Sequence, residues 1–232
     1  MSAAISSRLA PLGDKALVVQ LGERINRATF DAVQALSRHL EQQGLRGMIE
    51  YVPAFTTVTI YYDSLQVSFA EMSAALEGAI ASLDDLESVP GRVVEIPVCY
   101  GGEFGEDLDS VAEQHGLSAA EVIAIHSGAE YLVHMLGFAP GFPYLGGLPE
   151  TIATPRKATP RLKVPAGSVG IAGAQTGIYP LETPGGWQII GRTPLAMFHA
   201  TNDPPTLLQA GDRVRFTPIA PEEFHDLQAR PR

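Results

Sequence analysis

The stretch VPAGSVGIAGAQTGIYPLETPGGWQIIGRTP, residues 164–194, sets the character of the second half of the chain. Together with the residues before it, back to Gly137, it contains 11 of the chain's 23 glycines and 9 of its 18 prolines. Such frequent glycines and prolines demand many turns and permit only short strands. Apolar and aromatic residues between the turns supply a core, so the segment predicts a closed or partly closed β-barrel.

The first 98 residues show a different pattern, in which strand-like and helical stretches alternate. Runs of β-branched and aromatic residues predict four strands, and apolar residues at helical spacing predict two helices. The order β-α-β-β-α-β is that of a ferredoxin-like split βαβ sandwich, with two helices on one face of a sheet. The predicted strands are residues 15–21, 48–52, 57–62 and 92–98.

Capping residues mark where the helices begin. Asn26 precedes the first helix, and Ser68 opens the second with a capping box. In the second half of the chain, Ser118 opens a further short helix in the same way. We therefore expect an α+β protein with a ferredoxin-like domain over residues 1–98 and a β-barrel domain over residues 99–232.

The composition excludes several classes of function. The net charge is −10, from 26 acidic and 16 basic residues, so nucleic acid is not an expected partner. No stretch approaches the roughly 18 apolar residues that a membrane span needs, and no apolar signal segment begins the chain, so we expect no membrane association and a cytoplasmic location. The single cysteine, Cys99, fits a reducing compartment and a core position.

Residues 134–149 place aromatic rings in a loop whose glycines and prolines restrict the backbone. Loops restricted in this way often line binding sites, and Phe142 and Tyr144 are its candidate substrate-binding residues. The alternative is that these rings only plug one end of the barrel. His134 is a candidate catalytic residue, for which the alternative is a core histidine with satisfied hydrogen bonds.

Residues 155–163 carry four positive charges in an otherwise acidic chain, so this segment is expected to attract a carboxylate or a phosphate. Arg161 is the residue that we expect to bind it. The alternatives are a solvated basic loop and a patch that pairs with an acidic partner subunit. The sequence lacks the clustered His and Cys residues of a metal site, so no bound metal is expected. It also lacks a glycine-rich nucleotide loop, so no standard nucleotide site is expected in this chain.

Long motifs in this chain resemble those of a known family. They are residues 164–194, the Gly-Phe-x-Pro-Gly-Phe-Pro-Tyr-Leu of residues 137–145 and the Pro-Leu-Gly-Asp of residues 11–14. Together they resemble the family of 5-oxoprolinase B subunits, also called the allophanate hydrolase subunit 1 or KipI type, over nearly the whole chain. The resemblance implies a small N-terminal α+β domain and a C-terminal cyclophilin-like barrel.

The resemblance also implies work with a second protein, a 5-oxoprolinase C-type subunit (allophanate hydrolase subunit 2 type), and possibly with an A-type subunit. The implied activity is the ATP-dependent opening of 5-oxo-L-proline to L-glutamate, with ATP bound by the complex and the chain inactive alone. Two alternatives stay open. One is carboxyl transfer in a biotin-dependent urea or amide carboxylase, with biotin carried by a partner, and the other is inhibition of a sensor histidine kinase.

The implied chemistry suggests roles for individual residues. Opening a lactam requires polarisation of its carbonyl and a site for the ring carboxylate, which Arg161 or Arg192 would bind. Gln175 offers an amide beside glycines, and Glu182 is a candidate proton shuttle or partner of an arginine. The alternative is that residues 182–187 form only a turn. The remaining candidate substrate-binding residues are Tyr179, Gly185, Gly186 and Trp187.

Overall fold

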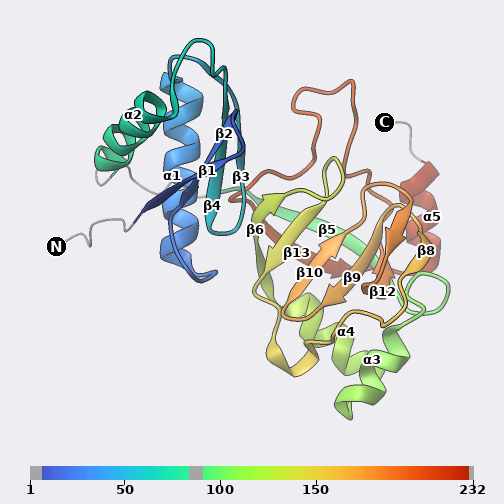
Figure 1. The fold of residues 1–232 in the computed structure, drawn as a ribbon. Helices are drawn as coiled ribbons and strands as arrows, with labels where there is room; N and C mark the ends of the chain where they lie inside the picture. The colour runs from blue at the N-terminus through green and yellow to red at the C-terminus, as the bar shows by residue number, and fades with distance from the viewer. Residues whose placement is uncertain (1–6, 84–90, 230–232) are drawn as a thin grey trace. The chain divides into compact units, whose positions relative to one another are not determined.

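The computed structural model describes residues 7–83 and 91–229 and has an α+β fold. The chain divides into two compact units, Met1–Val89 and Pro90–Arg232 (Figure 1). Each unit has a hydrophobic core of its own. Within the described ranges, no helix is long and apolar enough to cross a membrane. Nor do three His, Cys, Asp or Glu side chains of these ranges gather into a group that could hold a metal ion.

The first unit is a four-stranded antiparallel sheet with two helices, and its strand order is β1-β2-β4-β3. Buried residues of α1 recur at helical spacing, as Val33, Leu36 and Leu40 do, and pack against the sheet. Asn26 and Ser68 cap the two helices as predicted. The elements are β1 (Arg8–Leu12), β2 (Ala16–Gln20), α1 (Arg27–Gln43), β3 (Met48–Pro53), β4 (Thr57–Tyr62) and α2 (Phe69–Ala81).

The ferredoxin-like prediction is wrong in one strand. That fold requires residues 92–98 as a strand of the first sheet, but they lie in β5 (Val93–Tyr100), which is part of the barrel. The edge beside β2 is taken instead by β1, which turns back through Gly13, at φ 65°, and pairs with its immediate neighbour in the sequence. The predicted domain boundary after residue 98 therefore moves to Val89, because β5 belongs to the second unit.

The second unit contains a closed barrel of seven strands, in the order β10-β7-β6-β13-β5-β12-β9. A closed barrel is one of the two forms that the glycine and proline pattern predicts. Strands β5 and β13 pair in parallel, and the other neighbours pair antiparallel. The cyclophilin-like type of barrel stays a prediction. The strands after β5 are β6 (Glu130–Leu136), β7 (Pro143–Gly146), β9 (Ser168–Ala172), β10 (Gln175–Ile178), β12 (Gln188–Arg192) and β13 (Arg213–Pro218).

Helices and a separate two-stranded ribbon surround the barrel. Figure 1 shows α3 and α4 together at one end of it. Ser118 caps α4 with the predicted capping box. Cys99 is buried beside Phe104 and Phe224, as expected of a core position. These elements are α3 (Leu108–His115), α4 (Ala119–Gly128), the 3-10 helix η2 (Glu150–Ile152), α5 (Pro221–Ala229) and the ribbon strands β8 (Arg161–Val164) and β11 (Thr183–Gly185).

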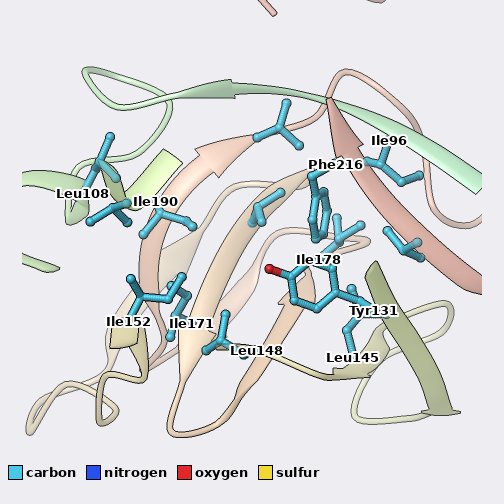
Figure 2. Close-up of a cluster of buried hydrophobic side chains, with 14 of the residues drawn as sticks. Ile96, Leu108, Tyr131, Leu145, Leu148, Ile152, Ile171, Ile178, Ile190 and Phe216 are labelled. Carbon is cyan, nitrogen blue, oxygen red and sulfur yellow. The ribbon is translucent and has the colours of Figure 1, made fainter. Parts of the chain in front are cut away.

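Aliphatic side chains fill the barrel around a few aromatic rings. Figure 2 shows Tyr131 and Phe216 near each other, with Ile178 and Leu145 close by. The two aromatic rings meet edge to face, with centroids 5.3 Å apart. All four side chains are almost completely buried, so the barrel interior is a packed core and not a channel.

One polar network crosses this core. His126 is fully buried, with Nδ1 2.8 Å from the Tyr100 hydroxyl and Nε2 3.0 Å from Thr176 Oγ1. Thr176 Oγ1 donates to the Gly170 carbonyl at 2.9 Å, and the Tyr131 hydroxyl donates to the His126 carbonyl at 2.7 Å. Because the one Thr176 hydroxyl proton goes to Gly170, Nε2 must carry the imidazole proton and Tyr100 must donate to Nδ1. We call Tyr100, His126, Tyr131 and Thr176 the His126 network.

Candidate functional site

The predicted aromatic residues form one cluster in the barrel unit. Phe142 lies at its centre, with ring centroids 5.0 Å from Tyr144, 5.3 Å from Tyr179 and 5.4 Å from both Trp187 and Phe138. Phe142, Tyr179 and Trp187 are at most 5% exposed, so they form a small core of their own. They support the surface above them, and only Phe138 and Tyr144 of this aromatic cluster offer area to a ligand.

Phe138 forms the exposed edge of the aromatic cluster. Its backbone φ is 68°, a costly value for a residue with a side chain, and its ring is 62% exposed. Backbone strain of this kind persists where the surroundings impose it, often at functional sites. The same loop lines a surface pocket of about 350 Å³, a volume that suits a small molecule. The pocket is lined by residues 136–141 and Thr206.

Arg161 is held by two carboxylates. Its Nε donates to Glu106 Oε1 at 2.8 Å, and its Nη2 donates to Asp107 Oδ1 at 2.7 Å. The same Oδ1 accepts from Lys157 Nζ at 2.7 Å, and Oδ2 accepts from the Ile189 amide at 2.7 Å. Asp107 is only 3% exposed, so these bonds satisfy a buried charge. We call Glu106, Asp107, Lys157 and Arg161 the Arg161 network.

Asp107 and Arg161 stabilise each other in their charged forms. Burial alone would raise the pKa of Asp107, but hydrogen bonds from Arg161, Lys157 and the Ile189 amide outweigh it and lower that pKa. The hydrogen bond to Asp107 in turn raises the pKa of the Arg161 guanidinium. Nη1 of Arg161 is covered from solvent and has no hydrogen-bond partner in the described part of the chain. A charged donor left without an acceptor is costly, so Nη1 is a place where an anionic oxygen would be stabilised.

A β-bulge turns Arg161 toward the aromatic cluster. In the β8–β11 ribbon, Val164 lies opposite Thr183 and Arg161 lies opposite Gly185, so three residue steps of β8 face two of β11. Side chains alternate along a regular strand, which would put residues 161 and 164 on opposite faces. The extra residue instead places Arg161 on the face of Val164, which is buried in the aromatic core.

The two adjacent glycines predicted to bind substrate differ in their surroundings. A Cβ at Gly185 would lie 2.3 Å from the Tyr179 hydroxyl, so only glycine leaves room for this hydroxyl beside the residue opposite Arg161. At Gly186 the nearest atom would be 3.6 Å away, an ordinary contact. The Gly186 carbonyl accepts the Lys157 amide at 2.7 Å. Gly185 is therefore fixed by packing, whereas Gly186 contributes only its backbone.

Two predicted catalytic residues, Gln175 and His134, lie on other strands, β10 and β6. Gln175 pairs with Gly146 across β10 and β7, and a Cβ at Gly146 would lie 2.3 Å from His134 Nε2. Paired residues project to the same face of a sheet, so Gln175 and His134 share a face. Burial lowers the pKa of His134, which favours its neutral form. Gln175 and His134 therefore lie on one face of the sheet, on either side of Gly146.

Glu182 and Arg192 do not join the Arg161 network. Glu182 is exposed and pairs with Lys163 at 3.2 Å, so the expectation that it pairs with an arginine is wrong. Arg192 Nε donates to the Ala166 carbonyl at 3.0 Å. Both side chains were candidates, but Glu182, directly before β11, contacts Lys163, and Arg192, at the end of β12, contacts Ala166.

Asp107 is the residue of this site that sequence reasoning missed. It stands directly before α3, where an aspartate is normally interpreted as a helix cap, but its side chain makes no capping bond. Its hydrogen bonds come from residues 50, 54 and 82 positions later in the chain. An aspartate at the N-cap of a helix is ordinary, so no local pattern distinguishes Asp107.

Comparisons with known proteins agree with these observations. The family described as "Carboxyltransferase domain, subdomain C and D" matches residues 7–208. The 5-oxoprolinase B subunit of Bacillus subtilis (strain 168) is 49% identical over 94% of this chain and 95% of its own length. The solved structure of the protein TTHA0988 aligns with a TM-score of 0.79 and 38% identity, over 89% of this chain and 40% of that longer chain.

A more distant relative comes from a larger protein. "Urea amidolyase" of Saccharomyces cerevisiae is 23% identical over 91% of this chain, which spans only 13% of that protein. The near-complete match to the Bacillus subtilis protein confirms the resemblance that the motifs indicated. The chain belongs to the family of the carboxyltransferase domain, subdomain C and D, and to the proteins of that family named as B subunits of 5-oxoprolinase.

Proposed function

We propose that this chain acts as the B subunit of an ATP-dependent 5-oxoprolinase complex that opens 5-oxo-L-proline to L-glutamate. The support is the Bacillus subtilis relative, which carries that name and matches over 95% of its own length. Such a name implies further subunits, and we expect a C-type partner and possibly an A-type subunit. The chain alone is expected to be inactive, because its barrel supplies only part of the site.

The single observation that carries the assignment of the site is the unpartnered Nη1 of Arg161. 5-Oxoproline is a lactam with one carboxylate, and a guanidinium held in a fixed orientation is suited to bind that group. The guanidinium of Arg156, 5.9 Å from the Trp187 ring centroid, adds positive charge nearby. We place the lactam ring against Phe138 and Tyr144, which have the exposed surface of the aromatic cluster.

Ring opening breaks the lactam C–N bond, and with ATP the reaction takes up two waters. One water would add to the carbonyl carbon and expel the ring nitrogen, and the second would hydrolyse the resulting acyl phosphate. Phosphorylation of the carbonyl oxygen by ATP would make that carbon a better electrophile, with ADP and phosphate released beside glutamate. Gln175 and His134 stay candidates to orient the carbonyl and move a proton. Among the described residues, the Arg161 network offers a single unpartnered donor, Nη1, which suits one carboxylate and not the three phosphates of ATP. This supports an ATP site on a partner subunit.

Reconstitution tests this proposal. The purified chain is combined with its C-type and A-type partners, and glutamate release is measured with and without ATP. We expect ATP-dependent release from the complex and none from the chain alone. Arg161→Ala should lower kcat/KM on the order of 10- to 100-fold, the loss of one charged hydrogen-bond partner.

Arg215→Ala provides the matched control, because it removes the same charge from an arginine paired with Glu130 on the barrel surface. It should keep close to wild-type turnover. Glutamate release by the isolated chain, or full activity of Arg161→Ala, would contradict the proposal.

A second function is favoured by the description of the family. A carboxyltransferase component of a urea or amide carboxylase fits the name of the matching domain and the urea amidolyase relative. This function requires biotin on a partner subunit. Incorporation of labelled bicarbonate into urea, dependent on a biotinylated partner, would favour it over lactam opening.

A further inference from the structure

Asp107 is fixed to the barrel at two points. Its backbone amide donates to the Ile189 carbonyl at 2.8 Å, and its Oδ2 accepts from the Ile189 amide at 2.7 Å. The preceding backbone also lies directly on β12, since a Cβ at Gly105 would be 2.1 Å from the Ile190 carbonyl oxygen. The carboxylate is therefore held by rigid strand backbone and cannot follow a moving side chain.

One oxygen of this carboxylate holds two cations together. Asp107 Oδ1 accepts from both Lys157 Nζ and Arg161 Nη2, each at 2.7 Å. Two positive groups meeting at one point repel each other unless a full negative charge lies between them. The orientation of the Arg161 guanidinium therefore depends on the charge of Asp107 and not only on its hydrogen-bonding capacity.

These contacts use two of the three guanidinium nitrogens of Arg161 and do not use Nη1. Nε is taken by Glu106 and Nη2 by Asp107, whereas Nη1 has no acceptor within the described residues. Nη1 is covered, although the Arg161 side chain as a whole is 19% exposed, so the guanidinium lies close to the surface. A buried charged donor without an acceptor is the group that gains most from an arriving carboxylate.

We propose that Asp107 is a positioning residue, which holds Arg161 so that Nη1 receives the carboxylate of a small carboxylic acid substrate. This inference rests on the proposed function of the site. Asp107 touches no substrate itself and acts through the guanidinium. Its contribution is therefore specific to ligands that carry a negative charge.

The test is Asp107→Asn in the reconstituted complex. The amide oxygen of Asn can still accept from the Ile189 amide, but a neutral group no longer offsets the charges of Lys157 and Arg161. We expect KM for 5-oxoproline to rise about 10-fold or more while kcat stays within about 3-fold, because binding is lost before chemistry. The inhibition constant of the uncharged carboxamide of 5-oxoproline should stay within about 2-fold.

Asp212→Asn is the matched control. Asp212 is also 3% exposed, pairs with Arg92 at 2.6 Å and accepts from the Gln209 amide at 2.9 Å. This substitution should cost comparable stability and leave the preference for the acid over the carboxamide unchanged. Equal loss of the acid and the carboxamide in Asp107→Asn, or a loss confined to kcat, would overturn the inference.

If the wild-type complex is inactive on 5-oxoproline, the proposed function is ruled out, but the positioning role of Asp107 can still be tested. In that case calorimetry with 5-oxoproline decides it. Binding to the wild-type complex that weakens about 10-fold in Asp107→Asn supports the positioning role. Equal binding to both proteins, or binding to neither, overturns it.

Discussion

Two polar networks of the barrel unit differ in whether every donor finds an acceptor among the described residues. In the His126 network, each proton has a place, running from Tyr100 to His126, from His126 to Thr176 and from Thr176 to the Gly170 carbonyl. In the Arg161 network, the charged groups are paired with one another, yet Nη1 of Arg161 has no acceptor among residues 7–83 and 91–229. When every donor of a network is paired, none is available to bind a ligand. When one donor is unpaired, it can form a hydrogen bond to a ligand.

The surroundings of the two networks account for this difference. His126 is sealed inside the barrel against Phe216, at 4.6 Å between ring centroids, where an unpaired polar group would cost stability without compensation. Arg161 lies on a ribbon outside the closed barrel, next to an aromatic cluster in which Phe138 is exposed and Tyr144 is partly buried. We infer that the His126 network serves folding and that the Arg161 network serves binding. The predictions below test this division.

The largest effect is expected from His126→Ala. The substitution removes a fully buried ring and leaves the Tyr100 hydroxyl and Thr176 without their partner. The free energy of unfolding should therefore fall by about 3–5 kcal/mol. Urea denaturation of the isolated chain measures this change. Turnover per folded molecule of the reconstituted complex should change little, because no hydrogen bond among the described residues joins the His126 network to the Arg161 network.

Thr176→Val keeps the shape of the side chain and removes the hydroxyl, so it should cost less, about 1–3 kcal/mol. A His126→Ala protein that keeps its stability but loses turnover would break the division between the two networks.

A pH dependence follows from the burial of His126. Burial lowers the pKa of His126 from 6.5 to about 3, so the native state holds the neutral imidazole while the unfolded chain becomes protonated below 6.5. The stability that His126 contributes is therefore complete above pH 6.5 and is lost progressively as the pH falls toward 3. Between about pH 7.5 and about pH 5, the loss amounts to about 2 kcal/mol.

The comparison of wild type with His126→Ala isolates this contribution from that of all other titrating groups. The difference in unfolding free energy between the two proteins should shrink by about 2 kcal/mol over that interval. A difference that stays constant with pH would mean that water reaches the imidazole and that the His126 network is not sealed.

Gly185, the last residue of β11, and the adjacent Gly186 allow a second comparison, near Arg161. Gly185→Ala forces a Cβ against the Tyr179 hydroxyl and should lower the unfolding free energy by about 1–2 kcal/mol. Gly186→Ala has ordinary contacts only and should stay within about 0.5 kcal/mol of wild type. Thermal or urea unfolding of both variants measures the contrast. Equal effects would show that the Tyr179 hydroxyl is not wedged beside the ribbon.

Much of the fold could be predicted because local patterns determine local structure. Asn26, Ser68 and Ser118 mark the starts of three helices, and the structure confirms each cap. Which sheet residues 92–98 join could not be predicted from local patterns. Apolar residues there indicate a strand but do not say which sheet it joins, and β1 is mostly exposed and contains Pro11, so no alternating pattern announces the strand that takes its place.

The candidate site was predictable only in part, for a related reason. Phe142, Tyr144, Tyr179 and Trp187 were identified because aromatic residues among glycines and prolines are conspicuous, and the structure does place them together. Whether each ring is buried or exposed depends on packing across several strands. Long-range contacts likewise decide that Arg161 pairs with Asp107.

The smallest effect is expected from Glu182→Gln, and it tests whether charge alone can identify a functional residue. Glu182 was a candidate proton shuttle or partner of an arginine, yet its carboxylate pairs with Lys163, and both side chains are more than half exposed. Exposed pairs contribute little because water screens them and ordering two long side chains costs entropy, so the unfolding free energy should change by about 0.5 kcal/mol or less. If glutamate release by the complex stays at the wild-type rate, the exposed pair belongs to neither network. If release falls about 10-fold or more while stability holds, Glu182 acts at a surface completed by a partner subunit, and the free donor of Arg161 is then not the only open group of the site.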